Sequence, residues 1–289
     1  MSSGQSELTL VSRRSADCCG GLVRVVAAIT IVLACSGFAF ALLASASAAK
    51  QPEDGSFKIP ILVYHRFGPV VADSVTVTTP VFESHLRYLR DNHYTAIPLR
   101  RLVDYVLGKA PPPPARSVVI TADDSHRSVF TYMLPLVKRY HIPVTLFVYP
   151  SAISNASYAM TWEQLSALKQ TGFFDIQSHS YWHPNFRIEK RRLPAKEYER
   201  LVDMQLTKSK SLIEKRLGVR VEMLAWPFGI YDDELIDRAR KAGYIAAFTL
   251  ERRHAGQSDN IMEIPRYLMT DAVRGKAFGR LLAGESARQ

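Results

Sequence analysis

Two histidines four residues apart are the most chemically suggestive feature of the sequence. His179 and His183 enclose the tripeptide Ser-Tyr-Trp, and Pro184 follows directly. A proline disfavours helical geometry at the residue before it, so the pair is predicted to lie in a loop. Two histidines and one carboxylate form a common ligand set for catalytic zinc, and they leave coordination positions for water and substrate. The alternative is a pair of surface histidines that make ordinary hydrogen bonds.

An adjacent pair of aspartates supplies the carboxylate that such a site needs. Asp123 and Asp124 follow the apolar run Ser117–Thr121, which is predicted to be a buried strand. Neighbouring side chains of an extended segment point in opposite directions. One aspartate can therefore bind a metal, with Asp124 as the natural third ligand, while its neighbour faces the pocket as a base. The competing interpretation is a helix cap, because Asp-Asp-Ser before a helix also suits that role.

Apolar strand-like runs alternate with helical patterns along most of the chain. Strands are expected at residues 59–64, 117–121, 144–148, 173–177, 221–225 and 245–250. Helices are expected around residues 82–89 and 99–106, and over residues 129–140, 162–170, 195–217 and 232–242. This alternation predicts an α/β fold with a mostly parallel sheet. A single-domain (β/α) barrel fits the chain length, and an open doubly wound sheet is the alternative.

The candidate residues share one position relative to these strands. The aspartate pair, the histidine pair, the segment 226–229 and His65 each come where a predicted strand ends. In a parallel barrel the carboxyl ends of all strands open onto one face, where active sites lie. The sequence therefore predicts that these side chains meet on one face of the domain.

The N-terminal segment has the parts of an export signal. A polar stretch with three arginines ends at Arg24, and Val25–Ala49 contains no charged residue and ends in small residues with Ala-x-Ala patterns. These features predict a secretory signal peptide or an uncleaved membrane anchor over residues 1–49. Residues 50–58 are expected to be a linker, and residues 59–289 one catalytic domain. Export would place that domain in the periplasm or outside the cell, held at the inner membrane if the signal is not cleaved.

Composition and charge exclude several classes of function. All three cysteines lie in the first 35 residues, so the predicted domain has no thiol for catalysis, a disulfide or a metal. The net charge is +10, but the basic residues are scattered, which favours a solvated surface over a nucleic-acid interface. We therefore expect no nucleic-acid partner. No glycine-rich nucleotide motif is present in the sequence.

Three short motifs together resemble the polysaccharide deacetylase family (NodB-homology domain, carbohydrate esterase family 4). The motifs are Thr121-Ala122-Asp123-Asp124-Ser125, His179-Ser180-Tyr181-Trp182-His183-Pro184 and Trp226-Pro227-Phe228-Gly229. Ile61-Leu62-Val63-Tyr64-His65-Arg66 also resembles the first strand of the exopolysaccharide-modifying branch. The resemblance implies a distorted (β/α) barrel and a divalent metal, usually zinc. It further implies hydrolysis of N-acetyl groups on a glucosamine-containing polysaccharide, such as an exopolysaccharide or a cell-wall polymer.

The same resemblance implies a role for each candidate residue. Asp123 corresponds to the general base, and Asp124, His179 and His183 correspond to the metal ligands. A departing amine needs a proton, and His65 is our candidate for the general acid, in preference to His254 in a polar stretch. We expect five residues in or beside these motifs to contact the sugar: Tyr181, Trp182, Trp226, Pro227 and Phe228. The alternative is that the aromatic ones belong to the core.

The sequence departs from the family pattern at three positions. Ala122 and Ser125 stand where the family usually has an aromatic residue and a glycine, and Ala225 stands where many members have an arginine that steadies the base. These departures keep a catalytically weak or inactive carbohydrate-binding protein as an alternative. A metal amidohydrolase that acts on a small nitrogenous compound is a second alternative.

Overall fold

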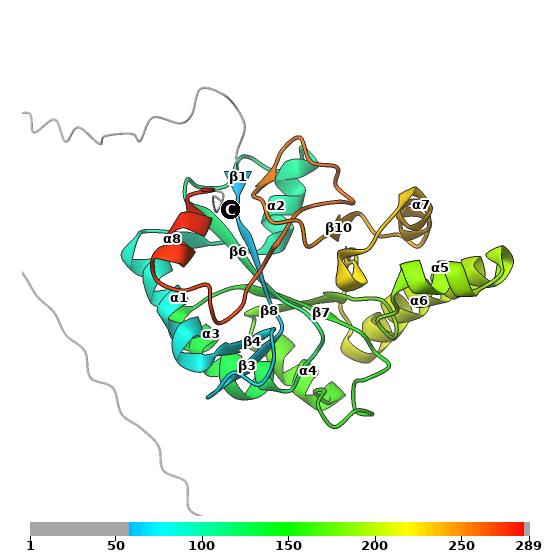
Figure 1. Ribbon diagram of the computed structural model, residues 1–289, viewed down its shortest axis with the longest axis horizontal. Coiled ribbons are helices and arrows are strands. Elements are labelled where there is room, and N and C mark those ends of the chain that lie inside the picture. Colours follow the sequence, from blue (N-terminus) through cyan, green and yellow to red (C-terminus); the bar gives the residue numbers. More distant parts are fainter. Residues whose placement is uncertain (1–57, 286–289) are drawn as a thin grey trace, which may run out of the picture. The chain divides into compact units, whose positions relative to one another are not determined.

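The computed structural model describes residues 58–285 (Figure 1). The predicted signal or anchor over residues 1–49, with its uncharged run, lies outside the described residues. Within the described range, no helix combines the length and the hydropathy that crossing a membrane requires.

An eight-stranded parallel sheet forms the centre of the domain. Its order is β10-β9-β8-β7-β6-β2-β12, with β5 beside the start of β6. Two small sheets pair β1 with β11 and β3 with β4. The strands are β1 Lys58–Ile59, β2 Ile61–Tyr64, β3 Arg66–Gly68, β4 Thr76–Thr78, β5 Thr95–Ala96, β6 Ser117–Ala122, β7 Val144–Val148, β8 Phe174–Ser178, β9 Met223–Ala225, β10 Ala246–Phe248, β11 Ala255–Gly256 and β12 Tyr267–Leu268.

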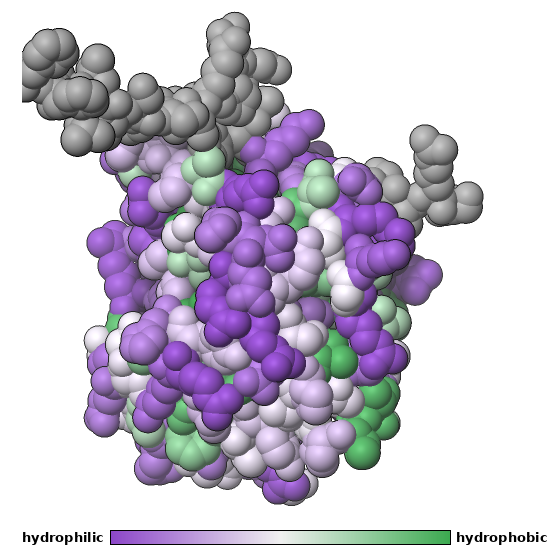
Figure 2. Space-filling model, turned by 90° about the vertical axis from the view of Figure 1, so that its left-hand side faces the viewer, coloured by the Kyte–Doolittle hydropathy of each residue, from purple (hydrophilic) through white to green (hydrophobic). Residues whose placement is uncertain are grey.

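Helices surround the strands, which run through the middle of the domain in Figure 1. They are α1 Thr79–Asp91, α2 Leu99–Val106, α3 Leu134–Tyr140, α4 Trp162–Gln170, α5 Phe186–Arg192, α6 Ala195–Leu217, α7 Asp233–Lys241 and α8 Lys276–Leu282, with a π-helical turn at Val129–Met133 and a 3-10 turn at Pro227–Gly229. Figure 2 shows the face that carries α1 and α8, where hydrophilic residues dominate and apolar ones are scattered.

The sheet is buried on both faces, as its continuous apolar strands predict. Successive residues of β2 belong to different clusters. Ile61 packs inside the curved sheet with Phe147 and Phe248, whereas Leu62 packs outside it against the helices. The sheet thus curls into a half-barrel, and the predicted single α/β domain of distorted-barrel type is confirmed. Between the edge strands β10 and β12, Ile264 donates a backbone hydrogen bond to Ala247 and partly bridges the opening.

One buried histidine fastens α8 and the segment before it to α1. His85 is 1% exposed, its ring stacks on Phe278, and its two nitrogens meet the Tyr64 hydroxyl and the Val273 carbonyl oxygen. Because a carbonyl can only accept, Nε2 carries the proton and Nδ1 accepts from Tyr64. Burial lowers the pKa of His85 to about 4, although the Val273 hydrogen bond opposes this shift.

We therefore predict that acid destabilises the domain through His85. The unfolded chain binds this proton near pH 6.5 and the folded chain only near pH 4, so stability falls as the pH decreases between these values. The loss reaches about 3 kcal/mol at the lower end. Denaturant unfolding of wild type and His85→Gln at pH 7 and pH 4.5 measures it. The variant should lose less stability on acidification, and an equal loss would contradict the assignment.

Candidate active site

A cavity of about 250 Å³ opens at the carboxyl ends of the central strands. The sequence predicted a site on this face. The cavity is lined by His65, Val75, Asp123, Asp124, His179, His183, Trp226, Phe228, Leu250 and Leu268. Both aspartates and both histidines of the motifs are thus brought together, although they come from separate strand ends.

Asp124, His179 and His183 converge on one point. The Asp124 Oδ1 atom lies 3.6 Å from His179 Nε2 and 3.7 Å from His183 Nε2. This oxygen is buried and has no hydrogen-bond partner. The separations are too long for hydrogen bonds but suit three ligands that each reach about 2 Å to a shared ion. We call these three residues the ligand cluster.

The loop after β8 fixes the orientation of both imidazoles. His179 Nδ1 donates to the Ala225 carbonyl oxygen at 2.8 Å, so its Nε2 lone pair faces Asp124. The Gln205 side chain on α6 accepts from the backbone amides of Tyr181 and Trp182. The histidine loop is therefore fastened to β9 on one side and to α6 on the other.

The protonation state of the second histidine also suits a metal. Burial and the neighbouring His179 lower the pKa of His183 to about 4, so its imidazole is neutral at neutral pH. A neutral imidazole offers the lone pair that a metal requires. With two oriented nitrogens and an unpartnered buried carboxylate oxygen, the residues of the ligand cluster fit a divalent ion.

Asp123 is held by an arginine that sequence reasoning missed. Arg266, just before β12, is fully buried and donates to both Asp123 oxygens at 2.9 and 2.8 Å. Arg266 also donates to the Thr249 carbonyl oxygen. Burial alone would raise the pKa of Asp123, but Arg266 and His179 outweigh it and bring the value to about 2. Asp123 is therefore an ionised carboxylate, fixed in orientation, 3.8 Å from His179 Nε2.

The structure places the two candidate acids in different regions. His65 lines the cavity, and its Nδ1 atom is buried without a hydrogen-bond partner. Burial lowers the pKa of His65, against the opposing effect of Asp123 and Asp124. His254 instead bonds to the Leu281 carbonyl oxygen and lines a separate pocket with Lys58 and Arg252. Only His65 of these two can reach a substrate in the cavity.

The predicted sugar-contacting residues are only partly gathered at the cavity. Phe228 is 55% exposed, and its ring lies 4.5 Å from that of His183. Trp226 lines the cavity but is fully buried, with its indole nitrogen donating to the Met262 carbonyl oxygen. The remaining three residues, Tyr181, Trp182 and Pro227, do not line it. The Tyr181 ring packs against the Lys208 ammonium, Trp182 is 41% exposed and Pro227 is buried.

Comparison with known proteins identifies the family. A family model described as polysaccharide deacetylase matches residues 110–247. The matched range includes the aspartate pair, the histidine pair and the motif at residues 226–229. The chain therefore contains a polysaccharide deacetylase domain. Members of this family are hydrolases that act on amides.

Relatives and solved structures are similar over most of the chain. The Bacillus subtilis protein YxkH is 26% identical over 222 residues, 77% of this chain and 75% of that protein. The poly-β-1,6-N-acetyl-D-glucosamine N-deacetylase of Staphylococcus aureus N315 is 25% identical over 201 residues, 68% of each chain. Deacetylase PplD of Streptococcus pyogenes has the same fold, with a TM-score of 0.70 at 20% identity over 78% of this chain and 99% of that one. IcaB of Ammonifex degensii has a TM-score of 0.69 at 23% identity, and the match covers 80% of this chain and 97% of that one.

The buried arginine bears on one departure from the motifs expected in polysaccharide deacetylases. The sequence has Ala225 where an arginine was expected to steady the base. In the structure Arg266, which lies just before β12, contacts both Asp123 oxygens. A guanidinium fork matches a carboxylate in this bidentate geometry. The lack of an arginine at position 225 therefore does not leave Asp123 without a cationic partner.

The glycine position of the first motif shows backbone strain. Asp124 and Ser125 both have left-handed backbones, with φ of 75° and 60°. Ser125 is also fully buried, and its hydroxyl oxygen has no hydrogen-bond partner. Left-handed geometry costs a non-glycine residue roughly 1–2 kcal/mol, and a buried unpaired hydroxyl adds to this. The serine therefore fits this position less well than the glycine typical of polysaccharide deacetylases.

We predict that Ser125→Gly stabilises the domain by about 1 kcal/mol, after the entropy cost of glycine in the unfolded chain is subtracted. Ser180→Gly is a matched control, since Ser180 has a φ of 64° but its hydroxyl accepts from the His183 amide. The control should gain less or lose stability. Urea unfolding measures both variants. A Ser125→Gly variant no more stable than wild type would contradict this account of the strain.

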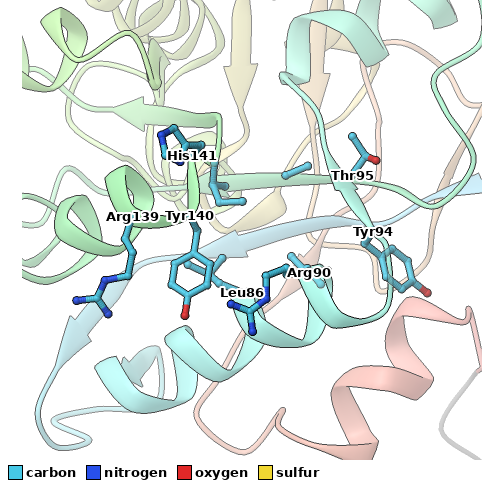
Figure 3. A pocket seen from close by; sticks show the side chains of 10 residues that line it. Leu86, Arg90, Tyr94, Thr95, Arg139, Tyr140 and His141 are labelled. Atoms are coloured by element: carbon cyan, nitrogen blue, oxygen red, sulfur yellow. The ribbon is translucent and has the colours of Figure 1, made fainter.

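A larger pocket of about 510 Å³ lies between the C-terminal parts of α1 and α3 (Figure 3). Its charged side chains are already paired, because Arg90 contacts Asp91 and Arg139 contacts Glu83. The carboxyl ends of helices in parallel units meet the amino ends of the strands, opposite the catalytic face. This pocket therefore does not contribute to the ligand cluster.

Proposed function

We propose that the chain is a metal-dependent hydrolase that removes N-acetyl groups from a glucosamine-containing polysaccharide. The observation that carries this proposal is the convergence of Asp124, His179 and His183 beside the arginine-held carboxylate of Asp123. The proposed metal is zinc, because two histidines and one carboxylate are typical of catalytic zinc. The Staphylococcus aureus relative, named for a poly-N-acetylglucosamine substrate, supports an exopolysaccharide as the polymer.

The ligand cluster and Asp123 divide the work of hydrolysis. When bound, a divalent ion supplies Lewis acidity, which polarises the acetyl carbonyl and makes a nearby water more acidic. Asp123 accepts a proton as the water oxygen attacks the carbonyl carbon. Arg266 keeps this carboxylate ionised and aimed into the cavity. Asp123 is a weak base in the resting enzyme, so its proton transfer depends on an acidified water.

The second half of the reaction releases the amine. The carbon–nitrogen bond breaks, acetate leaves with the water oxygen, and the sugar nitrogen requires a proton. His65 is positioned for this transfer because it lines the cavity. Burial keeps its resting form neutral near pH 7, so His65 takes up the proton that Asp123 has accepted from the attacking water and passes it to the amine nitrogen. Phe228, exposed beside His183, provides an apolar surface for the sugar ring.

The proposal is tested by measuring the acetate that zinc-loaded protein releases from N-acetylated polymers. The polymers to be compared are poly-β-1,6-N-acetylglucosamine, chitin oligomers and peptidoglycan. We expect release from at least one polymer and loss of release on chelation. A carbohydrate-binding protein without activity would bind a polymer and release no acetate. A small-molecule amidohydrolase would act on simple acetamides and leave every polymer intact.

The role of His65 predicts a dependence on the leaving group. His65→Ala should slow hydrolysis of an N-acetyl sugar by roughly two orders of magnitude or more, the usual scale for a lost proton donor. The same variant should spare an activated aryl acetate ester, whose leaving group needs no proton. His254→Ala is the matched control and should change neither rate. If His254→Ala shows the selective loss and His65→Ala does not, the acid is misassigned.

The proposed site of action is outside the cytoplasm. Its support is the uncharged run Val25–Ala49 after Arg24, which the structure does not describe. A C-terminal reporter enzyme that is active only in the cytoplasm should stay inactive in the fusion. An active reporter would place the domain inside.

A further inference from the structure

We propose a second sugar-binding subsite beside the ligand cluster, formed by Tyr149 and Tyr158 and backed by His126. We call Tyr149 and Tyr158 the tyrosine pair. The proposal rests on the proposed function, since it assigns the pair to the neighbouring sugar of the same polymer. Its consequence is that the enzyme recognises a chain and not a single N-acetylglucosamine.

A continuous series of side-chain contacts leads from the ligand cluster to the tyrosine pair. The Tyr149 ring centroid lies 5.5 Å from that of His183. The two tyrosine hydroxyls are 2.9 Å apart and share a hydrogen bond. The Tyr158 ring then lies parallel to His126, with centroids 6.2 Å apart and an interplanar angle of 9°. The pair thus begins at a metal-ligating residue and extends outward from it.

Backbone hydrogen bonds hold the pair in a fixed position relative to the cluster. Arg127 donates to the Tyr158 carbonyl oxygen, and Met160 donates to that of Ser125, which joins this segment to the loop after Asp124. Ser151 donates to the Tyr181 carbonyl oxygen within the histidine loop. The segment that carries the pair is therefore tied to both loops of the ligand cluster, and its side chains are preorganised for a ligand.

The surface of the pair has the chemistry of a sugar-binding platform. Tyr158 is 42% exposed, and its ring lies parallel to that of His126 with the centroids 6.2 Å apart. An exposed aromatic side chain suits the carbon–hydrogen face of a pyranose ring. The two phenols have two O–H donors and use one in their mutual bond, so one donor and several lone pairs remain for sugar hydroxyls.

The tyrosine pair and Phe228 lie in different segments of the chain, although Tyr149 and Phe228 both contact His183. His183 has ring contacts with both Phe228, at 4.5 Å, and Tyr149, at 5.5 Å. Aromatic surfaces from residues 149–158 and from the turn at residue 228 thus both adjoin the ligand cluster. A sugar whose acetyl group enters the cavity has neighbours along the polymer, and the tyrosine pair offers a place for one of them.

The test is the dependence of kcat/KM on chain length, measured with zinc-loaded full-length protein on N-acetylglucosamine and its oligomers up to the hexamer. We expect wild-type kcat/KM to rise with length. Tyr158→Ala should lower it about tenfold on the hexamer, the effect of losing one aromatic contact. The same variant should leave the monomer and an aryl acetate ester unchanged. Tyr158→Phe, which keeps the ring, should retain most of the wild-type value.

Tyr94→Ala is the matched control, because Tyr94 is a partly buried tyrosine in the pocket of Figure 3, away from the ligand cluster. It should behave as wild type. Calorimetric binding of the fully deacetylated hexamer gives a readout without turnover, and its Kd should rise about tenfold in Tyr158→Ala. Tyr158→Ala with wild-type kinetics and binding at every length overturns the subsite and leaves the deacetylase intact. Tyr158-dependent binding without any acetate release supports the subsite and overturns the proposed reaction.

Discussion

Replacing His179 and His183 together by alanine abolishes both metal binding and acetate release in our account. Wild type should retain about one equivalent of zinc, because its two imidazoles and the Asp124 carboxylate converge within 4.8 Å of one another. The double variant keeps a single protein ligand, which is too few for a stable site. Loss of the ion removes several kcal/mol of transition-state stabilisation, so turnover should fall by at least about a thousandfold.

The design needs a control for the loss of histidines as such. His141→Ala removes an exposed histidine at the pocket of Figure 3 and should change neither metal content nor turnover. Elemental analysis and acetate release are measured on the same preparations, with circular dichroism to verify folding. Asp124→Ala should show the same loss of metal. Zinc retained at full occupancy after removal of both histidines would mean that the site is misassigned.

Asp123→Asn is expected to separate metal binding from chemistry. Asparagine preserves the shape of the side chain but cannot accept the proton, so turnover should fall by roughly 10²–10⁴-fold. The metal should remain at about one equivalent because Asp124 and both histidines are untouched. Arg266 loses its charged partner in this variant, and a buried unpaired charge destabilises a protein by about 3–5 kcal/mol. Turnover must therefore be measured well below the melting temperature of the variant.

A second carboxylate provides the comparison for this variant. Asp175 on β8 is partly buried and accepts from Gln177, but it lies outside the cavity. Asp175→Asn should keep wild-type turnover. Acetate release from folded, metal-loaded Asp123→Asn at a near-normal rate would move the base to another residue.

The regular parts of the fold could be predicted because their patterns are long or uniform. The apolar run of β7 and the periodicity of α4 and α6 gave expected boundaries that coincide with the observed ones. The short elements β3, β4, β12, α5 and α8 were not predicted. Two to seven residues are too few for a period to emerge, and tertiary contacts such as that between His85 and Val273 determine where these segments lie.

Site residues could be predicted where their type and spacing mark them. They could not be predicted where the role of a side chain depends on its burial in the folded domain. The aspartate and histidine pairs stand out by type and spacing, and the structure brings them together. Arg266 gives no such signal, since arginine is ordinarily at the surface and its partner Asp123 is 143 residues away. Trp226 shows the reverse problem, because a motif tryptophan suggests sugar stacking, whereas its indole is fully buried against Met262.

The most direct test of the central claim is a stoichiometric titration of chelator-treated protein with zinc, followed by acetate release from poly-β-1,6-N-acetylglucosamine. We predict that activity is absent without metal, rises linearly, and stops rising at about one equivalent per chain, as a single three-ligand site requires. The His179→Ala, His183→Ala double variant should stay inactive throughout. Full acetate release from metal-free protein, or the same zinc response in the double variant, would contradict the account.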